Sequence, residues 1–465
     1  MVSISRTIRA DFRTQLLGKI LPGSARDDAA IITIIWKFLL IGLLIRFIFM
    51  PFACHADLLS EYWRAHMLAY HFDLAHPYSF TDILHGIVLF GLKWLMPGNI
   101  DLYFHPWGHS ADIIAQSELF GWGTSTTNNW LTFISQDSIF RALFFFKLPY
   151  LIFDLASAFL CLHIFERGGR GVKIFIYWML NPVIIYSAYI FGRFDVIVLF
   201  FILLVFYSIK RWNIHIGSLF LGLSIISRGF TLLLLPLYLL AERDLYGKLK
   251  IVIFALIPLI LWKALSGLFS TGSVESSIAS LTSSGLFFIT PRFVSAPLAT
   301  QVNSIAFFIV GYILLILIFY PKANVIHNKP METIHYLNDL FLIAMCLLFA
   351  FGSMSMHYFA WIIPFLLIKA SESKEFWYAH LFTILGWLLY NITYFTGLYG
   401  RTVVGTGLFA SINPAFAEYT TISTLMVEWT ALPHTTLVVI ARSLWVATLL
   451  YLIYLTVQGR RGIHG

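Results

Sequence analysis

Asp57 is the first candidate for chemistry in this chain, because it follows the first long apolar run by only a few residues. Tyr62 and Trp63 come soon after it, and Pro77-Tyr78 follows later. A carboxylate at a membrane edge, partly withdrawn from water, can remove a proton from an acceptor hydroxyl as a general base. It can also be no more than the polar end of a helix, so its role depends on which other residues share its side of the membrane.

Other ionisable groups in the same stretch can share or take over that role. They are His55, Glu61 and Asp73. His105 and His109 have the spacing of two metal ligands on a helix, but the proline and glycine between them disfavour a helix. We therefore expect no bound metal and no cofactor, and we expect the histidines to line a substrate or the surface.

Two arginines at the ends of later apolar runs have the chemistry of a phosphate site. Arg193 lies with Asp195 in a Gly-Arg-Phe-Asp turn, and Arg228 interrupts an apolar run between a serine and a glycine. A guanidinium is always charged and offers paired donors that match phosphate oxygens. The alternative is that both side chains only reach toward lipid headgroups.

A further polar group follows a Gly-Ser break late in the chain, where His357 and Tyr358 precede Trp361 by one helical turn. An imidazole there can donate to or accept from a sugar or phosphate oxygen. Tyr358 and Trp361 can instead belong to the aromatic belt at a membrane surface.

Ionisable residues also occur inside apolar runs, where they are costly and face a cavity or a partner. Arg46 comes late in the first run, and Lys147 and Asp154 lie seven residues apart in another. Two helical turns separate Lys147 from Asp154, so both point the same way. They either line a substrate groove or hold the helices together as ion pairs.

Composition predicts a membrane protein. Of the 465 residues, 59% are hydrophobic and 12% are charged, and such a surface must meet lipid. The net charge of +8 is not concentrated in a soluble segment, so it does not indicate nucleic acid.

The three cysteines have neither disulfide nor metal spacing and are expected in the core. The first apolar run is too late and too long for a cleavable signal, so we expect it to remain as a span.

The apolar runs predict about twelve crossings, several of them short or broken. They cover residues 31–53, 140–165, 172–190, 196–209, 214–227, 230–241, 249–269, 304–320, 340–352, 357–369, 376–394 and 435–457. With a cytoplasmic amino terminus, roughly 19 of the 31 basic residues fall in cytoplasmic loops and about seven in outer loops. Both termini are then cytoplasmic, and Asp57, Arg193, Arg228 and His357 all fall on the outer face.

This topology divides the chain into three parts. We expect residues 1–30 to be a cytoplasmic amphipathic segment. A transmembrane module over 31–302 follows, with outer loops 54–139 and 270–303, and a variable carboxyl-terminal transmembrane module covers 303–465, with outer loop 396–434. The segment 83–96 is apolar but short, and crossing there would place a basic loop outside, so we expect an interfacial or re-entrant helix.

Several elements, taken in chain order, carry a resemblance to a known family. They are Asp57 with Tyr62-Trp63, the segment 65–69, Pro77-Tyr78, Trp178-Asn181-Pro182, Gly192-Arg193-Phe194-Asp195, Arg228 with Pro236, and His357-Tyr358-Phe359-Ala360-Trp361 with Pro364. Together they resemble the GT-C superfamily of membrane glycosyltransferases, in particular the mannosyltransferase branch that includes the GPI first-mannose enzyme and its bacterial relatives. Arg228 departs from the many relatives that carry lysine there, and residues 98–138 match no branch.

The resemblance implies an all-α polytopic fold with about twelve spans, a large outer loop between the first two spans, and an inverting glycosyltransferase. The enzyme would move a hexose, mannose or glucose, from a polyprenyl- or dolichyl-phosphate carrier to a lipid-linked or glycan acceptor on the outer face. Asp57 would be the base, and Arg228, Arg193 and His357 would hold the donor phosphate. The substrate would be lined by His55, Glu61, Tyr62, Trp63, Asp73, Tyr78, Lys147, Asp154, Asp195 and Tyr358.

The main alternative is a transporter or flippase of a lipid-linked sugar, with the buried charges along its path. The chain lacks the two related halves typical of such transporters, and its polar residues gather on one face instead of at the midplane. We expect a monomer in the bilayer with no nucleic-acid partner. A bacterial inner membrane is favoured over the endoplasmic reticulum.

Overall fold

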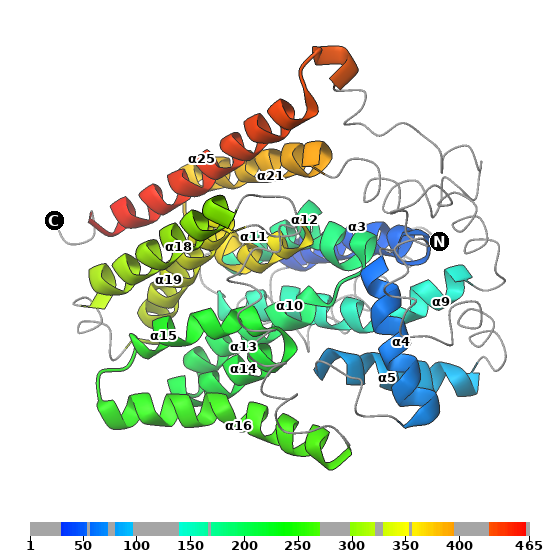
Figure 1. Ribbon diagram of the computed structural model, residues 1–465. Coiled ribbons are helices and arrows are strands. Elements are labelled where there is room, and N and C mark those ends of the chain that lie inside the picture. The colour runs from blue at the N-terminus through cyan, green and yellow to red at the C-terminus, as the bar shows by residue number, and fades with distance from the viewer. Residues whose placement is uncertain are drawn as a thin grey trace.

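The computed structural model describes residues 29–53, 56–72, 80–95, 139–165, 169–269, 298–320, 329–352, 356–394 and 427–461. Every regular element in these ranges is a helix (Figure 1). The predictions for the amino-terminal segment, for His55, Asp73 and Tyr78, and for most of the three outer loops lie outside the described residues.

The helices follow one another in three groups along the chain. The first group is α3 (Ala29–Phe52), α4 (Ala56–His71), α5 (Phe80–Leu95), α9 (Ile139–Phe146), α10 (Leu148–Ile164), α11 (Arg170–Met179), α12 (Pro182–Ile185) and the π-helix η3 (Tyr186–Phe191). The second is α13 (Asp195–Arg211), α14 (Ile214–Ser227), the 3-10 helix η4 (Gly229–Leu233), α15 (Leu234–Leu239) and α16 (Leu245–Phe269). The third is α18 (Leu298–Phe319), α19 (Pro330–Phe351), the 3-10 helix η6 (Met356–Ile362), α20 (Ile363–Ala370), α21 (Lys374–Tyr394) and α25 (His434–Arg461).

A helix occupies each of the apolar runs predicted to cross. Among the described residues, α3, α16, α19 and α25 are long and apolar enough to span a membrane, and two bent pairs raise that number to six. The pairs are α9 with α10, bent by 41°, and α11 with α12 and η3, bent by 42°. The described part of the chain is therefore all-helical and compatible with a polytopic membrane protein, while the larger number of crossings stays a prediction.

Local sequence explains the second bend. Asn181 stops α11, and its side-chain oxygen accepts hydrogen bonds from the amides of Val183 and Ile184, at 3.0 and 3.3 Å. Pro182 occupies the first helical position, where its missing N–H leaves no bond unmade. This cap starts a new helix in a new direction, which leads through η3 to the turn at Gly192.

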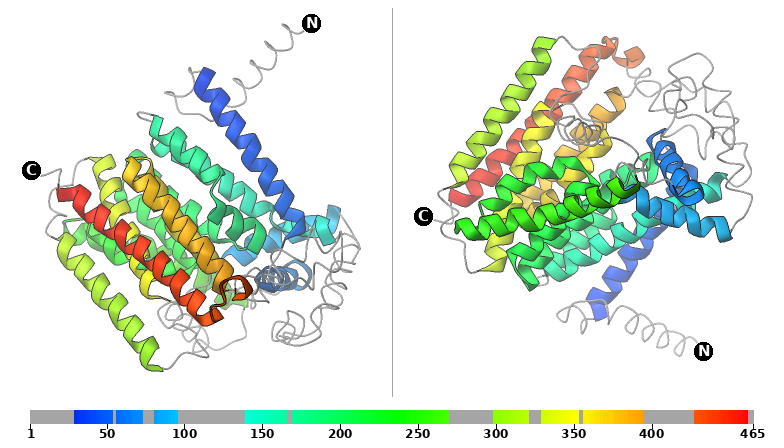
Figure 2. Two further views of the ribbon diagram at one scale, coloured as in Figure 1. Left: turned by 90° about the horizontal axis from the view of Figure 1, so that it is seen from above. Right: turned by 60° about the horizontal axis from the view of Figure 1, so that its bottom comes forward.

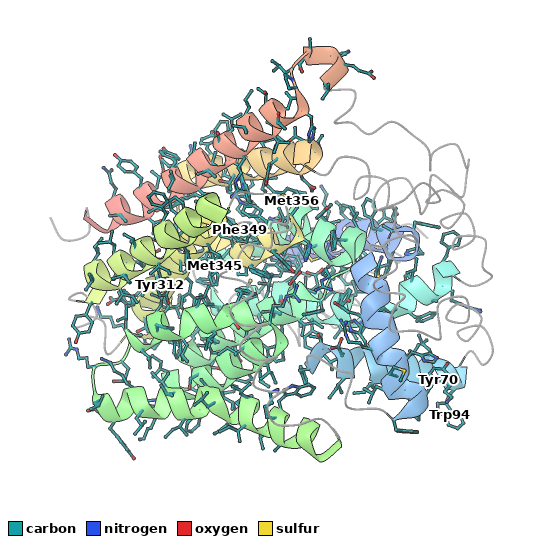
Figure 3. The ribbon with its side chains drawn as sticks, in the orientation of Figure 1. Tyr70, Trp94, Tyr312, Met345, Phe349 and Met356 are labelled. Atoms are coloured by element: carbon teal, nitrogen blue, oxygen red, sulfur yellow. The ribbon has the colours of Figure 1, made fainter. Side chains whose placement is uncertain are left out.

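The core lies around α13, α19 and α20, whose side chains are largely buried. The helices α21 and α25 lie side by side across this core, and α16 packs against α14 on the opposite side (Figures 1 and 2). Figure 3 marks Tyr312 on α18, Met345 and Phe349 on α19, and Met356 beyond the end of α19. The Tyr312 hydroxyl donates to the Leu233 carbonyl of η4, and the Phe349 ring packs against Phe359 of η6 and Trp445 of α25. The outward faces of α3, α16, α18, α21 and α25 carry exposed apolar residues, as contact with lipid requires.

Helices α4 and α5 pack against each other near one end of the molecule, and α5 also touches α9 and α10 (Figure 1). The predicted short helix in this loop is therefore present as α5. One face of α5 buries Asp82 and His85, whereas Ile87 and Trp94 are exposed. This pair of helices brings α4 to the end of η3, where the candidate site forms.

Candidate functional site

Glu61 of α4 lies at the centre of a buried polar cluster. Its Oε1 accepts a hydrogen bond from Arg193 Nη1 at 2.5 Å, and its Oε2 accepts one from the Tyr150 hydroxyl at 3.2 Å. His85 of α5 approaches from another side, with Nδ1 4.0 Å from Oε2. Four segments far apart in sequence therefore meet at one carboxylate.

The turn after η3 sets the position of Arg193. The amides of Gly192 and Arg193 both donate to the Ser187 carbonyl, at 3.1 and 2.9 Å. Gly192 has φ +84°, a left-handed conformation that favours glycine, and a β-carbon there would lie 3.0 Å from Leu58 of α4. The turn can therefore form and touch α4 because it has a glycine at this point.

Arg228 joins the cluster from the gap between α14 and η4. Its extended backbone, with φ −157° and ψ 116°, ends α14, and its Nε lies 3.7 Å from Asp195 Oδ1. The Phe194 ring is shared by the two guanidiniums, with Arg193 Cζ at 5.0 Å and Arg228 Cζ at 4.8 Å from its centroid. Arg228 also lies 5.0 Å above the Tyr358 ring, so aromatic faces hold both cations.

Two other groups besides Arg228 hold Asp195. Trp361 Nε1 donates to Oδ1 at 2.8 Å, and the Ser187 hydroxyl donates to Oδ2 at 3.3 Å. Trp361 is itself stacked between Phe230 and Tyr358, with centroids 3.6 and 4.4 Å apart. The carboxylate is thus fixed in place and acts as a rigid counter-ion for Arg228.

The cations and carboxylates of the cluster differ in exposure. The side chains of Arg193 and Arg228 keep 10% and 12% of their surface exposed, whereas Glu61 and Asp195 are fully buried. The exposed part of the cluster therefore belongs to the two arginine side chains and not to the carboxylates. Positive side chains at the rim of a site suit an anionic ligand.

Burial raises the pKa of the Glu61 carboxyl to about 7, although Arg193 and Arg64 pull it down. Burial also lowers the pKa of the His85 imidazole to about 4, so this ring is neutral at physiological pH even though Asp82 favours its charged form. Both residues lie outside the candidate spans. The cluster therefore contains one carboxyl that titrates near neutrality.

The second set of predicted residues forms a separate buried network. Asp154 accepts hydrogen bonds from Arg46, Tyr189 and Trp178, each at 2.6 Å. Lys147 donates instead to main-chain carbonyls of Tyr189 at 2.8 Å and Met50 at 3.0 Å, and to that of Ala53.

This network ties the end of α3 to α10, α11 and η3. Arg46, Lys147, Asp154 and Tyr189 are fully buried. The contact with Arg46 favours the ion-pair interpretation for Asp154. Lys147 is held by main-chain carbonyls, so both residues join helices together instead of lining a substrate groove.

The predicted site residues fall into three groups. Glu61, Arg193, Asp195, Arg228 and Tyr358 come together. His357 is buried next to them, with its ring centroid 4.1 Å from that of Phe191 and 4.0 Å from that of Tyr358. Lys147 and Asp154 belong to the separate network. Asp57, Tyr62 and Trp63 lie within α4, but their side chains are outside the described residues. Asp57 precedes Glu61 by one helical turn and directly precedes Leu58, which touches the Gly192 turn.

Tyr150, Phe194 and Trp361 belong to the cluster but were not among the predicted site residues. Tyr150 gives no signal, because an aromatic residue in an apolar run has the pattern of a core residue. Phe194 and Trp361 stand within elements of the resemblance, where neither was assigned a role in the site. Trp361 is fully buried and donates to Asp195 instead of facing lipid. The belt interpretation was wrong for Trp361, and its spacing of one turn from His357 was the signal that it shares the site.

No family model, no curated protein and no solved structure matches this chain. Function must therefore be inferred from the geometry of the cluster.

Proposed function

We propose that this protein is an inverting glycosyltransferase that takes a hexose, mannose or glucose, from a polyprenyl- or dolichyl-phosphate carrier. The acceptor is a lipid-linked or glycan hydroxyl on the predicted outer face of the membrane. The proposal places the enzyme in a GT-C type fold with about twelve crossings, and the twelve helical apolar runs are compatible with it.

One observation carries the proposal: two guanidiniums from separate segments share the Phe194 ring and keep part of their surface exposed. Two adjacent guanidiniums that stay partly exposed suit a phosphate group, because their paired donors match its oxygens. Their carboxylate partners, Glu61 and Asp195, hold them apart in fixed positions. The same cluster touches α4, which carries the predicted base.

The reaction assigns a defined role to each group. The acceptor oxygen attacks the anomeric carbon while the bond from that carbon to the phosphate oxygen breaks, and its electron pair leaves with the phosphate. Asp57 accepts the proton of the acceptor hydroxyl. Arg228 and Arg193 stabilise the charge that develops on the departing phosphate monoester. The proton on Asp57 is then lost to water.

Asp57 is preferred to Glu61 as the base on physical grounds. Glu61 is fully enclosed and already accepts hydrogen bonds from Arg193 and Tyr150. An acceptor hydroxyl could reach this carboxylate only by displacing one of them. Glu61 therefore serves better as the group that orients Arg193.

The test is the variant Asp57→Asn in purified protein. Polyprenyl-phosphate mannose and polyprenyl-phosphate glucose serve as donors, and alkyl glycosides serve as acceptors. We expect kcat to fall by roughly 10²- to 10⁴-fold, as for the loss of a general base. Glu332→Gln is the matched control, because Glu332 is an exposed carboxylate paired with Lys329 far along the chain, and its rate should stay at the wild-type value.

Two results would contradict the proposal. Transfer by Asp57→Asn at the wild-type rate would remove Asp57 as the base. If the wild-type protein in vesicles moves the donor across the bilayer and transfers no sugar, it is a transporter.

A further inference from the structure

The carboxyl-terminal helices reach the segment that carries His357 and Tyr358. Arg442 of α25 donates through Nη2 to the Gly352 carbonyl at 2.7 Å. Its Nη1 donates to the Tyr390 hydroxyl of α21 at 3.1 Å, and Cζ lies 5.4 Å from the centre of that ring. The guanidinium thus binds the end of α19 and is held in position by Tyr390 of α21.

A second bond holds the other side of the same connection. Trp387 of α21 donates through Nε1 to the Met356 carbonyl at 3.0 Å. Gly352 follows the last residue of α19, and Met356 is the first residue of η6. Figure 3 marks Met356 near Phe349, at this end of α19. Two side chains from the carboxyl-terminal helices therefore fix the carbonyls that flank the entry into η6.

The residues of η6 in turn touch the cation site. Tyr358 places its ring against Arg228, and Trp361 donates to Asp195, the counter-ion of Arg228. Trp387 also packs edge-on against Tyr186 of η3, with centroids 5.3 Å apart. The same tryptophan therefore contacts η3, which leads to Arg193, and η6, whose Tyr358 lies against Arg228.

The position of Arg442 argues for a specific role. It lies within an apolar helix that qualifies as a membrane span, where a charged side chain is costly unless it is well satisfied. The last carbonyls of a helix lack partners within the helix, and a cation there is favourable. A hydrophobic residue would serve the packing of α21 against α25 as well, but it could not bind Gly352.

We infer that Arg442 and Trp387 are positioning residues of the donor site, which hold η6 so that Tyr358 and Trp361 keep Arg228 in place. The helices α21 and α25 then help to position the donor site, instead of forming a variable module with no part in it. This inference rests on the proposed function for its kinetic consequences, whereas its structural consequence can be measured without any activity.

Conservative variants test this role while preserving the fold. Trp387→Phe keeps the aromatic packing and removes the N–H donor. Arg442→Lys keeps the charge but lacks the rigid fork that serves Gly352 and Tyr390 together. Ser443→Ala on the exposed face of α25 is the matched control. The measurements are hydrogen–deuterium exchange over residues 356–362, binding of polyprenyl monophosphate, and the KM for donor and for acceptor.

We expect exchange over 356–362 to become faster in both variants, with exchange elsewhere unchanged. Binding of polyprenyl monophosphate should weaken by roughly three- to tenfold, which corresponds to one lost hydrogen bond. The donor KM should rise by a similar factor while the acceptor KM stays constant. The Ser443→Ala control should match the wild type in every measurement.

Unchanged exchange over 356–362 in both variants would overturn the inference. Faster exchange throughout the chain, or an equal rise in the KM for donor and acceptor, would also overturn it, because these are the effects of general destabilisation. If the wild-type protein transfers no sugar, the proposed glycosyltransferase fails, and the exchange measurements still decide the role of Arg442 and Trp387.

Discussion

At the scale of single residues, the site is built from carboxylates that are fully buried and arginines that are not. Glu61 pairs with Arg193 and Asp195 pairs with Arg228, and both arginine side chains stay partly exposed. Because the carboxylates already hold the two arginine side chains in place, less side-chain entropy would be lost when a phosphate binds. In the proposed donor site, Glu61 and Asp195 would therefore contribute to phosphate binding without contacting the phosphate.

Burial of Glu61 leads to a prediction about pH. Its pKa in the folded chain, about 7, exceeds the ordinary value of 4.5. Between these values the folded state holds a proton that the unfolded state has lost, so the free energy of unfolding contributed by Glu61 falls as pH rises from 4.5 to 7. Outside this window the contribution is level.

The variant Glu61→Gln measures this effect through thermal unfolding between pH 5 and 7.5. The pKa of His85 is lowered from 6.5 to about 4, so its contribution to the free energy of unfolding rises with pH. His85 is present in both proteins, so the quantity to compare is the difference in unfolding temperature between wild type and variant at each pH. We expect the unfolding temperature of the wild type to decline with rising pH relative to Glu61→Gln. Parallel curves would show that Glu61 titrates at its ordinary pKa.

At the scale of elements, interruptions of helices position the site residues. Arg193 follows a π-helix, Arg228 occupies a gap before a 3-10 helix, and Tyr358 lies within another 3-10 helix. If these segments were continuous, straight α-helices, the three side chains would not converge at one point. Irregular backbone inside a membrane protein is tolerated where protein surrounds it, and protein surrounds these three segments.

The glycine of the Arg193 turn provides a test at this scale. Gly192→Ala introduces a side chain at φ +84° and places its β-carbon 3.0 Å from Leu58, which we expect to cost about 1–2 kcal/mol in stability. It should also lower transfer by shifting Arg193. Gly91→Ala in α5 is the control, since a β-carbon there meets nothing within 4 Å, and alanine favours a helix. Equal unfolding temperatures and rates for the two variants would contradict the strained turn.

At the scale of the whole molecule, the proposal requires that all segments that contribute to the site lie on the same side of the membrane. The charge distribution predicts that α4, the Gly192 turn, the Arg228 gap and η6 share the outer face. Their contacts in the structure are compatible with this prediction, because segments that begin or end on one face can meet there. Which membrane holds the protein remains part of the proposal.

Cysteine labelling tests the predicted topology. In a background with Cys54→Ala, where Cys161 and Cys346 are buried, we expect Ser110→Cys to react with an impermeant maleimide applied from outside. Lys374→Cys, an exposed position in a predicted cytoplasmic loop, should react only after permeabilisation. The reverse pattern would invert the topology and move the cluster to the cytoplasmic face.

The sequence by itself determined where the apolar runs lie and which residues carry charge, and from these it predicted the helices of a polytopic membrane protein. It also singled out Glu61, Arg193, Asp195, Arg228 and His357, because ionisable residues at the ends of apolar runs are rare and costly. These features follow from composition and local order, which need no knowledge of contacts.

Only the tertiary structure decided how these residues are paired. It assigned Arg193 to Glu61, separated Lys147 and Asp154 from the site, and enclosed Trp361 as the support of Asp195. It also brought Arg442 to Gly352, 90 residues away. Such contacts depend on the bends at Pro182 and Gly192 and on which helices pack together, and these long-range choices leave no periodic signal in the sequence.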